Sequence, residues 1–304
     1  MTYRLNALLI LLVALIGGPF YWLMIANPPR DPAVAVPITM AQLRTLAESI
    51  PGPHPERVEL TVVGSSQIMS NLIAAGSGMV NRTYSVIAFR LPVVGKGPIL
   101  IDTGLSAHLA GAEKLDHYFP ERQAGVDRDL RAASLILTTS ERAEHLGGLT
   151  VAAGQADGAA ILAKSQLNAQ QVPEPDVDFR IPWPLGLSVK PAINGDQPVA
   201  VAPGVVAIPA PSASPGSQLI YVRLRDGREY LFAGDVAPMA VNFQELRTPS
   251  NYSSQFSRPE DRPAMMRWLV TIAALRIQAP ELNIVPGHDY VWIVDRRNGN
   301  GIDH

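Results

Sequence analysis

The chain has 304 residues, of which 47% are hydrophobic and 17% charged, a composition typical of a folded globular protein. Its formal net charge is −2 and no dense Lys/Arg cluster occurs, which argues against a nucleic-acid partner. The sequence has no cysteine, and this excludes disulfides, thiolate metal sites and a cysteine nucleophile.

The N-terminal segment is long and apolar. Residues 5–26, LNALLILLVALIGGPFYWLMIA, are apolar apart from Asn6, and about 20 apolar residues suffice to cross a bilayer as a helix. Tyr21 and Trp22 fall near its far end, where aromatic side chains favour the membrane interface. A cleaved signal peptide is the alternative, but its apolar core is shorter, about 7–15 residues, and ends in a small-residue cleavage site. We therefore predict that residues 1–27 form an uncleaved membrane anchor.

The basic residues around this segment set its expected orientation. Arg4 precedes the apolar run, and Arg30 follows shortly after it. Basic residues tend to remain on the cytoplasmic side, and the short stretch before the run carries Arg4. We expect a single-pass protein of the cell inner membrane, with the following domain on the periplasmic or extracytoplasmic side.

The first half of the chain then alternates extended and helical patterns. Residues 28–56 form a Pro-rich linker with a short helix, for which Thr39 is the expected N-cap. Ser106 is the expected cap of the next helix. Strands are predicted at 58–64, 83–94, 97–104, 133–139 and 158–164, and helices at 106–119, 144–154 and from 165.

The second half repeats this style. Asp226–Gly227 predicts a tight hairpin turn within 217–235. Further strands are predicted at 204–211 and 282–288, and a long amphipathic helix at 258–279. The predicted organisation is one α/β domain over 57–295, with sheets packed inside helices, followed by a solvated tail at 296–304.

Polar stretches follow five of the predicted strands. Loops at strand ends are where binding and catalytic sites are usually assembled. In chain order, these stretches are DTG at 102–104, SERAEH at 140–145, PSASPGS at 211–217, GD at 234–235 and PGHD at 286–289.

This ordered set resembles the metallo-β-lactamase fold superfamily. The resemblance covers residues 57–295 and implies an αββα sandwich with a metal site along one edge of its two sheets. Members of that superfamily are commonly hydrolases of lactams, thioesters, lactones or phosphoesters, and some use the same site for redox chemistry. Fold alone does not fix the reaction or the substrate.

The resemblance implies a degenerate pair of metal sites. The family loop has the form His-x-His-x-Asp-His before Gly-Gly, and a third histidine precedes the PGS stretch by two residues. The slots of the first metal site hold Ser140, Arg142 and Ala213, none of which is a usual metal ligand. The slots of the second site hold Glu144, His145, Asp235 and His288. Two histidines and two carboxylates suit one divalent ion, with Zn²⁺ first and Fe²⁺ or Mn²⁺ also acceptable.

Arg142, Glu144 and Asp235 are the expected catalytic residues. Removal of a dication from beside buried carboxylates leaves uncompensated charge, which is costly. A guanidinium at Arg142 supplies part of the missing charge, by pairing with Asp235 or Glu144 or by acting as an electrophile toward a substrate. Glu144 is one methylene longer than the family's aspartate, and this change affects the positioning of an attacking water more than metal binding.

Other polar residues receive supporting or surface roles. Asp102 is expected to hold a loop or a ligand rather than to bind metal. Ser140 lacks a nucleophile-elbow motif and is not expected to be a nucleophile. Residues 64–85 are either a lid or a flexible hairpin, and 238–256 are expected to wrap the site edge. The remaining histidines are expected on the surface: His54, His108, His117 and His304.

Two functional hypotheses remain open. The first is a membrane-anchored hydrolase that acts with at most one divalent metal on a small molecule with an ester-, lactone- or thioester-like group. The second is a metal-free pseudoenzyme of the same fold, in which Arg142, Glu144 and Asp235 form an ion-pair cluster and the domain serves as a binding module.

Overall fold

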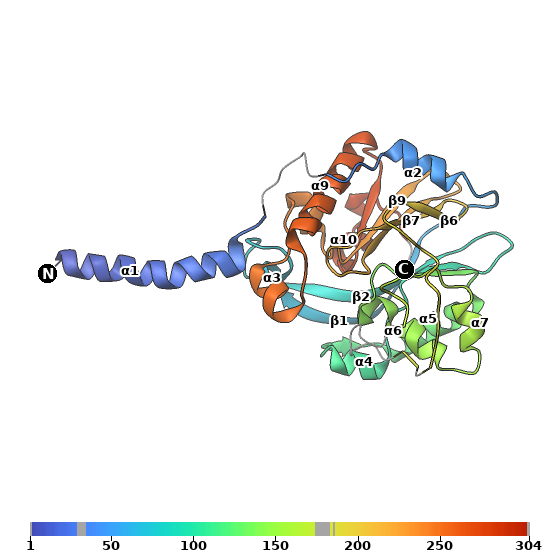
Figure 1. Cartoon of the computed structure of the whole chain (residues 1–304), viewed down its shortest axis with the longest axis horizontal. Coiled ribbons are helices and arrows are strands. Elements are labelled where there is room, and N and C mark those ends of the chain that lie inside the picture. The colour runs from blue at the N-terminus through green and yellow to red at the C-terminus, as the bar shows by residue number, and fades with distance from the viewer. Residues whose placement is uncertain (1, 29–34, 174–182, 185, 303–304) are drawn as a thin grey trace.

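The protein is described by a computed structural model that covers residues 2–28, 35–173, 183–184 and 186–302 (Figure 1). It contains two five-stranded sheets. The first sheet has the order β4-β1-β2-β3-β5 and the second β10-β9-β8-β7-β6. The strands of the first sheet are β1 Glu59–Met69, β2 Asn81–Leu91, β3 Ile99–Ile101, β4 His117–Tyr118 and β5 Leu135–Leu137. Those of the second sheet are β6 Val199–Ala202, β7 Val205–Pro209, β8 Gln218–Arg223, β9 Glu229–Gly234 and β10 Asn283–Pro286.

Helices cover the outer face of each sheet. The helices on the first sheet are α4 Ala107–Ala112, α5 Pro120–Ala132, α6 Ala143–Ala153 and α7 Gly158–Leu162. Those on the second sheet are α2 Met40–Ala47, α8 Ala240–Glu245 and α9 Arg262–Gln278. The short helix α3 Ser70–Ile73 lies in the connection between β1 and β2, and α10 Tyr290–Val294 places Ile293 in the core between the sheets.

Three apolar layers hold this arrangement together. On β7, Val206 and Ile208 pack outward against α2 and α9, whereas Val205 and Ala207 pack inward against the other sheet. Such alternation on strands buried on both faces creates a separate core on each side of the sheet. The predicted αββα sandwich is confirmed.

Two parallel strand pairs bring the polar loops to one edge. β3 pairs with β5 and β9 pairs with β10, both in parallel, so the carboxyl ends of each pair lie together. Gly234 has φ +48°, and a Cβ placed on it would lie 2.6 Å from the Thr139 side chain. The loops after β5 and β9 therefore approach each other at a distance that only glycine permits.

Several predicted elements differ from the structure. Residues 158–164 were predicted as a strand but form α7, because a short apolar run does not distinguish a buried strand from a buried helix. No helix begins at 165 among the described residues; Ser165 instead makes a bridge beside Ile136. The helix predicted at 106–119 ends at Ala112, although Ser106 caps it as expected.

One helix was not predicted, and the start of another was predicted too early. Helix α5, which starts at Pro120, was missed because its amphipathic pattern is weak. Helix α9 begins at Arg262 rather than at 258, and Asp261 is its N-cap, accepting from Ala264 N. Residues 258–261 are consequently a loop, and this places two charged side chains at the candidate site described below.

The C-terminal segment is not a solvated tail. The Tyr230 hydroxyl donates to the Asn300 carbonyl oxygen at 2.7 Å, and both Asn300 and Ile302 are buried. Ile302 belongs to the core between the sheets. Residues 303–304 lie outside the described part of the chain.

The N-terminal segment forms α1 Thr2–Phe20, which continues as a π-helical turn at Tyr21–Ile25. Pro19 lies just before this turn, where its missing N–H interrupts regular helical bonding. The helix projects away from the sandwich (Figure 1). Residues 3–25 have a mean hydropathy of 2.4 over their most apolar window and are long enough to cross a membrane. Residues 29–34 of the predicted Pro-rich linker lie outside the described residues.

The α2–β9 contact generates a stability prediction. Glu229 accepts two hydrogen bonds of 2.7 Å from Arg44 and one of 2.5 Å from Tyr221. Burial disfavours the carboxylate, but these hydrogen bonds outweigh it and lower the pKa of Glu229 below its ordinary value of 4.5. A lowered folded pKa means that Glu229 stabilises the fold above pH 4.5 and loses that contribution as pH falls through the folded value.

We therefore expect Glu229→Gln to lower the free energy of unfolding at pH 7 by about 1 kcal/mol, a small value because Arg44 is partly exposed. The free energy of unfolding of the variant should also decrease less than that of the wild type as the pH falls below 5. Chemical denaturation at a series of pH values measures both effects. An equal destabilisation of the variant at every pH would contradict the role assigned to the carboxylate.

Candidate metal centre

His145 is fixed by an acid behind it. It lies in the first turn of α6, and its Nδ1 is 2.8 Å from Asp102 Oδ2. Asp102 follows β3 with φ +62°, a conformation that an aspartate tolerates better than most residues. It also accepts from Thr139 N at 2.6 Å. Because a carboxylate only accepts, this contact places the proton on Nδ1 and directs Nε2 of His145 inward.

His288 is fixed in a similar way by the backbone. Its Nδ1 lies 2.9 Å from the carbonyl oxygen of Ser85, which can only accept. The Tyr84 ring stacks on the imidazole, with centroids 3.9 Å apart and planes inclined by 16°. These contacts hold the ring, and they leave Nε2 of His288 facing the site.

Asp235 lies between the two imidazoles. Its Oδ1 is 3.0 Å from His288 Nε2 and 3.3 Å from His145 Nε2. Potential ligand atoms of the three residues lie within 4.8 Å of one another, and all three residues are buried. The His145 Nε2 atom has no hydrogen-bond partner among the described residues.

This geometry fits a cation. With both Nδ1 protons donated outward, two nitrogen lone pairs and a carboxylate face one point, and such an arrangement is repulsive unless a metal ion or added protons occupy it. The two histidines and one carboxylate match the ligand set of catalytic zinc sites and of non-haem iron sites. Asp102 behind His145 matches the outer acid that orients a metal-binding imidazole.

The two negative neighbours of His145 also favour its protonation. Burial opposes the charged imidazole, but Asp102 and Asp235 outweigh burial and raise the pKa of His145 well above its ordinary range. In the absence of a metal, a proton on Nε2 of His145 would offset the charge of the Asp235 carboxylate instead.

Arg142 is the N-terminal neighbour of α6 and points into this site. Its Nη1 lies 3.2 Å from Asp235 Oδ2 and 3.5 Å from Glu260 Oε1, and its Nη2 donates to the Ala213 carbonyl oxygen at 2.5 Å. The expected pairing with Asp235 is therefore present. The guanidinium also ties the loop after β5 to the loop after β7, at the Ala213 position.

Glu144 is paired elsewhere. Arg258 Nη2 donates to Glu144 Oε1 and lies 3.2 Å from Glu113 Oε2. Burial opposes ionisation of Glu144, but the attraction of Arg258 outweighs it and lowers the pKa of this carboxyl to about 2. The structure does not bring Glu144 into the convergent group formed by His145, Asp235 and His288.

Carboxylates outnumber guanidinium groups in this region. Even without Glu260, whose pKa is raised by burial, four carboxyl groups face two guanidinium groups, a formal excess of two negative charges. The four are Asp102, Glu113, Glu144 and Asp235. A dication would balance this excess, and an imidazolium at His145 would offset half of it.

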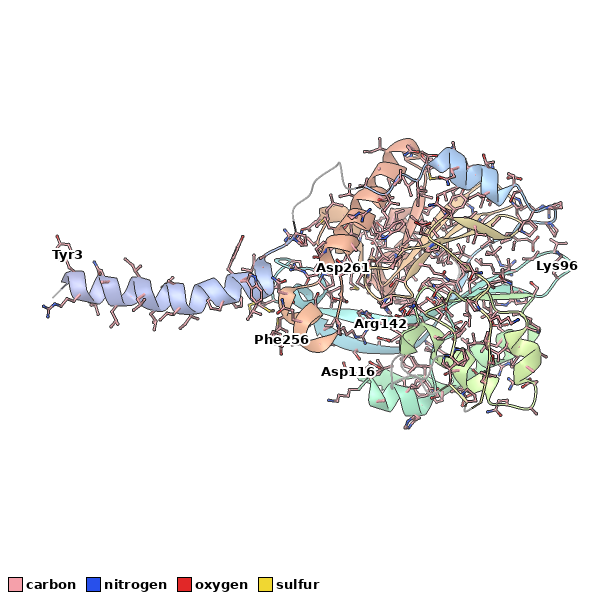
Figure 2. All side chains as sticks on the ribbon, in the orientation of Figure 1. Tyr3, Lys96, Asp116, Arg142, Phe256 and Asp261 are labelled. Carbon is pink, nitrogen blue, oxygen red and sulfur yellow. The ribbon has the colours of Figure 1, made fainter. Side chains whose placement is uncertain are left out.

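A cavity of about 360 Å³ opens beside these groups. Arg142, Glu144 and Asp235 are among its charged lining residues, and Ile68 and Tyr84 of the β1–β2 hairpin line it as well. Figure 2 shows Arg142 near the middle of the domain, where the two halves of the sandwich meet. The volume of the cavity is in the range of small-molecule sites.

The other sequence expectations have mixed outcomes. Asp102 lies behind His145, as expected. Residues 64–85 form the extended β1–β2 hairpin, which lines the cavity, and 249–257 contribute to its rim, as predicted for 238–256. His108 and His117 are exposed, whereas His54 is half-buried and lies 3.6 Å from Glu48; His304 lies outside the described residues.

Sequence reasoning missed the residues that complete the charge network. Arg258 and Glu260 were assigned to the start of the long helix, although a charged stretch next to Pro259 and Pro263 was a signal for a loop. Tyr84 carried no signal, because an aromatic residue in a strand more often packs in a core.

Comparisons with known proteins identify the fold of the chain. No protein-family model matches the chain, and no curated protein matches it. A quorum-quenching N-acyl homoserine lactone lactonase superimposes with a TM-score of 0.58 at 15% identity, covering 79% of this chain and 94% of that one. The chain has the metallo-β-lactamase fold.

Two further structures share this fold with the chain. One is an N-acyl homoserine lactone hydrolase with N-hexanoyl-L-homoserine at its catalytic metal centre, with a TM-score of 0.57, 14% identity, and coverage of 78% of this chain and 95% of that one. The other is a probable metal-dependent hydrolase from Staphylococcus aureus, with a TM-score of 0.56, 14% identity, and coverage of 79% and 91%. At these identities the likeness concerns the fold.

The buried Arg258–Glu144 pair generates a testable prediction. Arg258→Met leaves Glu144 as a buried carboxylate without its main partner, so we expect a loss of about 3 kcal/mol in the free energy of unfolding. The double variant Arg258→Met/Glu144→Gln removes both charges and should recover most of this loss. Denaturation of the two single variants and the double variant measures the coupling. Additive effects would show that the two side chains do not stabilise each other.

Proposed function

We propose that the chain is a membrane-anchored hydrolase of the metallo-β-lactamase fold that acts with a single divalent metal. Residues 1–27 are its anchor in the cell inner membrane, with the domain on the periplasmic side. Its substrate is a small molecule with an ester-, lactone- or thioester-like carbonyl. The observation that carries the proposal is the convergence of His145 Nε2, Asp235 and His288 Nε2 beside a cavity.

The metal would be held by His145, Asp235 and His288. Zn²⁺ is our first choice, and Fe²⁺ or Mn²⁺ fits the same ligands. When bound, such an ion supplies a Lewis acid that polarises a carbonyl and lowers the pKa of water. The slots Ser140, Arg142 and Ala213 offer no second set of ligands, so the proposal involves one ion.

The chain's own groups would orient the substrate. Arg142 lies at the cavity with its guanidinium partly free to donate beyond Asp235 and Ala213, because a guanidinium has five N–H donors. It is placed to bind a carbonyl oxygen or a developing oxyanion. Glu144, paired with Arg258, keeps its charge and can position a water in the cavity. The solved lactonases of the same fold support a lactone or a related ester as the first substrates to test.

Specific contacts favour the alternative, a metal-free binding module. Arg142 already pairs with Asp235, and Arg258 pairs with Glu144, so both candidate catalytic carboxylates have a cationic partner within the chain. Protonation of His145 would complete the balance of charge. In this alternative, the cavity binds a ligand without chemical change.

Metal content separates the two functions. The full chain, purified in detergent without chelator and dialysed, is expected to carry about one Zn, Fe or Mn per chain by elemental analysis, since the described residues contain one convergent set of three ligands. His288→Ala should lose the metal together with hydrolysis of esters and lactones. A chain that takes up no metal even after its addition, and that folds normally, would support the binding module.

Arg142 gives an independent test. Arg142→Met removes the cation beside Asp235, so without metal we expect a loss of about 3 kcal/mol in the free energy of unfolding. Added Zn²⁺ should restore most of this stability, because a dication replaces the missing charge and binding to the folded state stabilises it. Thermal unfolding with and without Zn²⁺ measures this, with His288→Ala/Arg142→Met as the matched control that lacks a ligand. If Zn²⁺ stabilised neither variant, the three residues would not form a metal site.

A further inference from the structure

Exposed apolar side chains lie on two segments that are hydrogen-bonded to the base of α1. Met79 and Val80 lie in the loop after α3 and are 63% and 60% exposed; Tyr252 and Phe256 lie in the segment before α9, and Phe256 is 69% exposed. Figure 2 shows Phe256 at the end of the domain from which α1 emerges. We call these four residues the apical face. Large apolar side chains grouped on a surface mark an interaction site more often than scattered ones do.

The base of α1 is hydrogen-bonded to the two segments that carry this face. Gly76 N donates to the Met24 carbonyl oxygen at 3.0 Å, and Asn251 Nδ2 donates to that of Trp22 at 2.7 Å. Asn27 adds a third link, donating to the Leu246 carbonyl oxygen at 2.8 Å. The last turn of the N-terminal helix and the apical face therefore form one unit.

The length of the helix fixes where this unit would lie in a membrane. Residues 3–25 form a span of 23 residues, about 35 Å at 1.5 Å per residue. The hydrocarbon core of a bilayer is about 30 Å thick. If α1 crosses it, Met24 falls at its boundary, and so does Gly76, which is bonded to Met24. The neighbouring Met79 and Val80 are then at the level of the lipid headgroups.

We propose that the apical face rests in the headgroup layer of the bilayer that holds α1. Tyr21 and Trp22 on the helix, and Tyr252 and Phe256 on the domain, then lie at the same interface, where such rings are favoured. Side chains of interfacial segments enter this region by about 5–10 Å. The contact needs no further protein, because the lipid covers these apolar side chains.

This placement also concerns the candidate site. Ser253 and Ser257, on the same segment as Phe256, line the cavity that contains Arg142 and Asp235. One rim of the cavity is thereby held against the membrane surface. The inference rests on the anchor of the proposed function, and it is independent of the metal and of the reaction.

The chain is suited to a direct test because it has no cysteine. Phe256→Cys in the full chain would be labelled with an environment-sensitive fluorophore and reconstituted in phosphatidylcholine nanodiscs. Val94→Cys is the matched control: it is an apolar residue, 49% exposed, near Lys96, which Figure 2 places at the end opposite α1. Leu12→Cys reports on insertion of α1 itself.

We expect nitroxide-headgroup lipid to quench the label at 256 by at least about 2-fold, given the shallow depth of interfacial side chains, and to leave the label at 94 unaffected. A nitroxide on the acyl chain should quench the label at 12. Quenching at 12 without quenching at 256 would overturn the apical contact while leaving the anchor in place. If the label at 12 also remained unquenched, α1 would not be in the bilayer, and both the anchor and the apical contact would be wrong. Neither readout depends on metal binding or hydrolysis.

Discussion

The rest of the site depends on the balance of charge around Asp235. This carboxylate is buried at the carboxyl end of β9 and contacts His145, His288 and Arg142. An isolated carboxylate in such a place is too costly to retain. Arg142 supplies positive charge to Asp235. The three neighbours come from two segments of the chain, because Arg142 and His145 both lie at the start of α6, whereas His288 follows β10. The need to compensate one buried acid therefore links the loop after β9, which carries Asp235, to the start of α6 and to the loop after β10.

The sandwich makes this concentration of charge geometrically feasible. Parallel pairing of β3 with β5 and of β9 with β10 ends both pairs on one edge. Gly234 lets the loop after β5 approach β9 closely. Outer contacts from Asp102 and the Ser85 carbonyl then set the direction of both imidazoles. The contacts of Asp235 with His145 and His288 are buried, and burial strengthens their electrostatic interaction.

The sequence predicted the architecture well, because it depends on short-range patterns. Alternating strands, the Asp226–Gly227 turn and the polar residues after strands are visible in local windows of the chain. The order of the loop motifs, through the family resemblance, predicted the αββα sandwich. Errors occurred where the local pattern was ambiguous, as at 158–164, where a short apolar run forms a helix.

The candidate site was harder to predict from the sequence than the fold, for a physical reason. Asp235 and His288 follow strands directly, so their location at the edge is implied by topology. The pairing of Arg258 with Glu144 joins residues 114 positions apart, and no local pattern encodes it. Glu144 matched a ligand slot by position, but in the structure it pairs with Arg258. Arg258 lies in a loop that the sequence pattern predicted as helix. A motif predicts where in the fold a residue lies, whereas the side chain with which that residue pairs depends on how distant loops pack.

The junction at the base of α1 has a consequence for the order of synthesis. Asn27 contacts Leu246, and Trp22 contacts Asn251, across separations of more than 200 residues in each case. During synthesis, α1 therefore makes these contacts with the domain only after residues 246–251 have been added. Until then its direction relative to the sandwich is undetermined, so the fixed angle between helix and domain is a property of the completed fold.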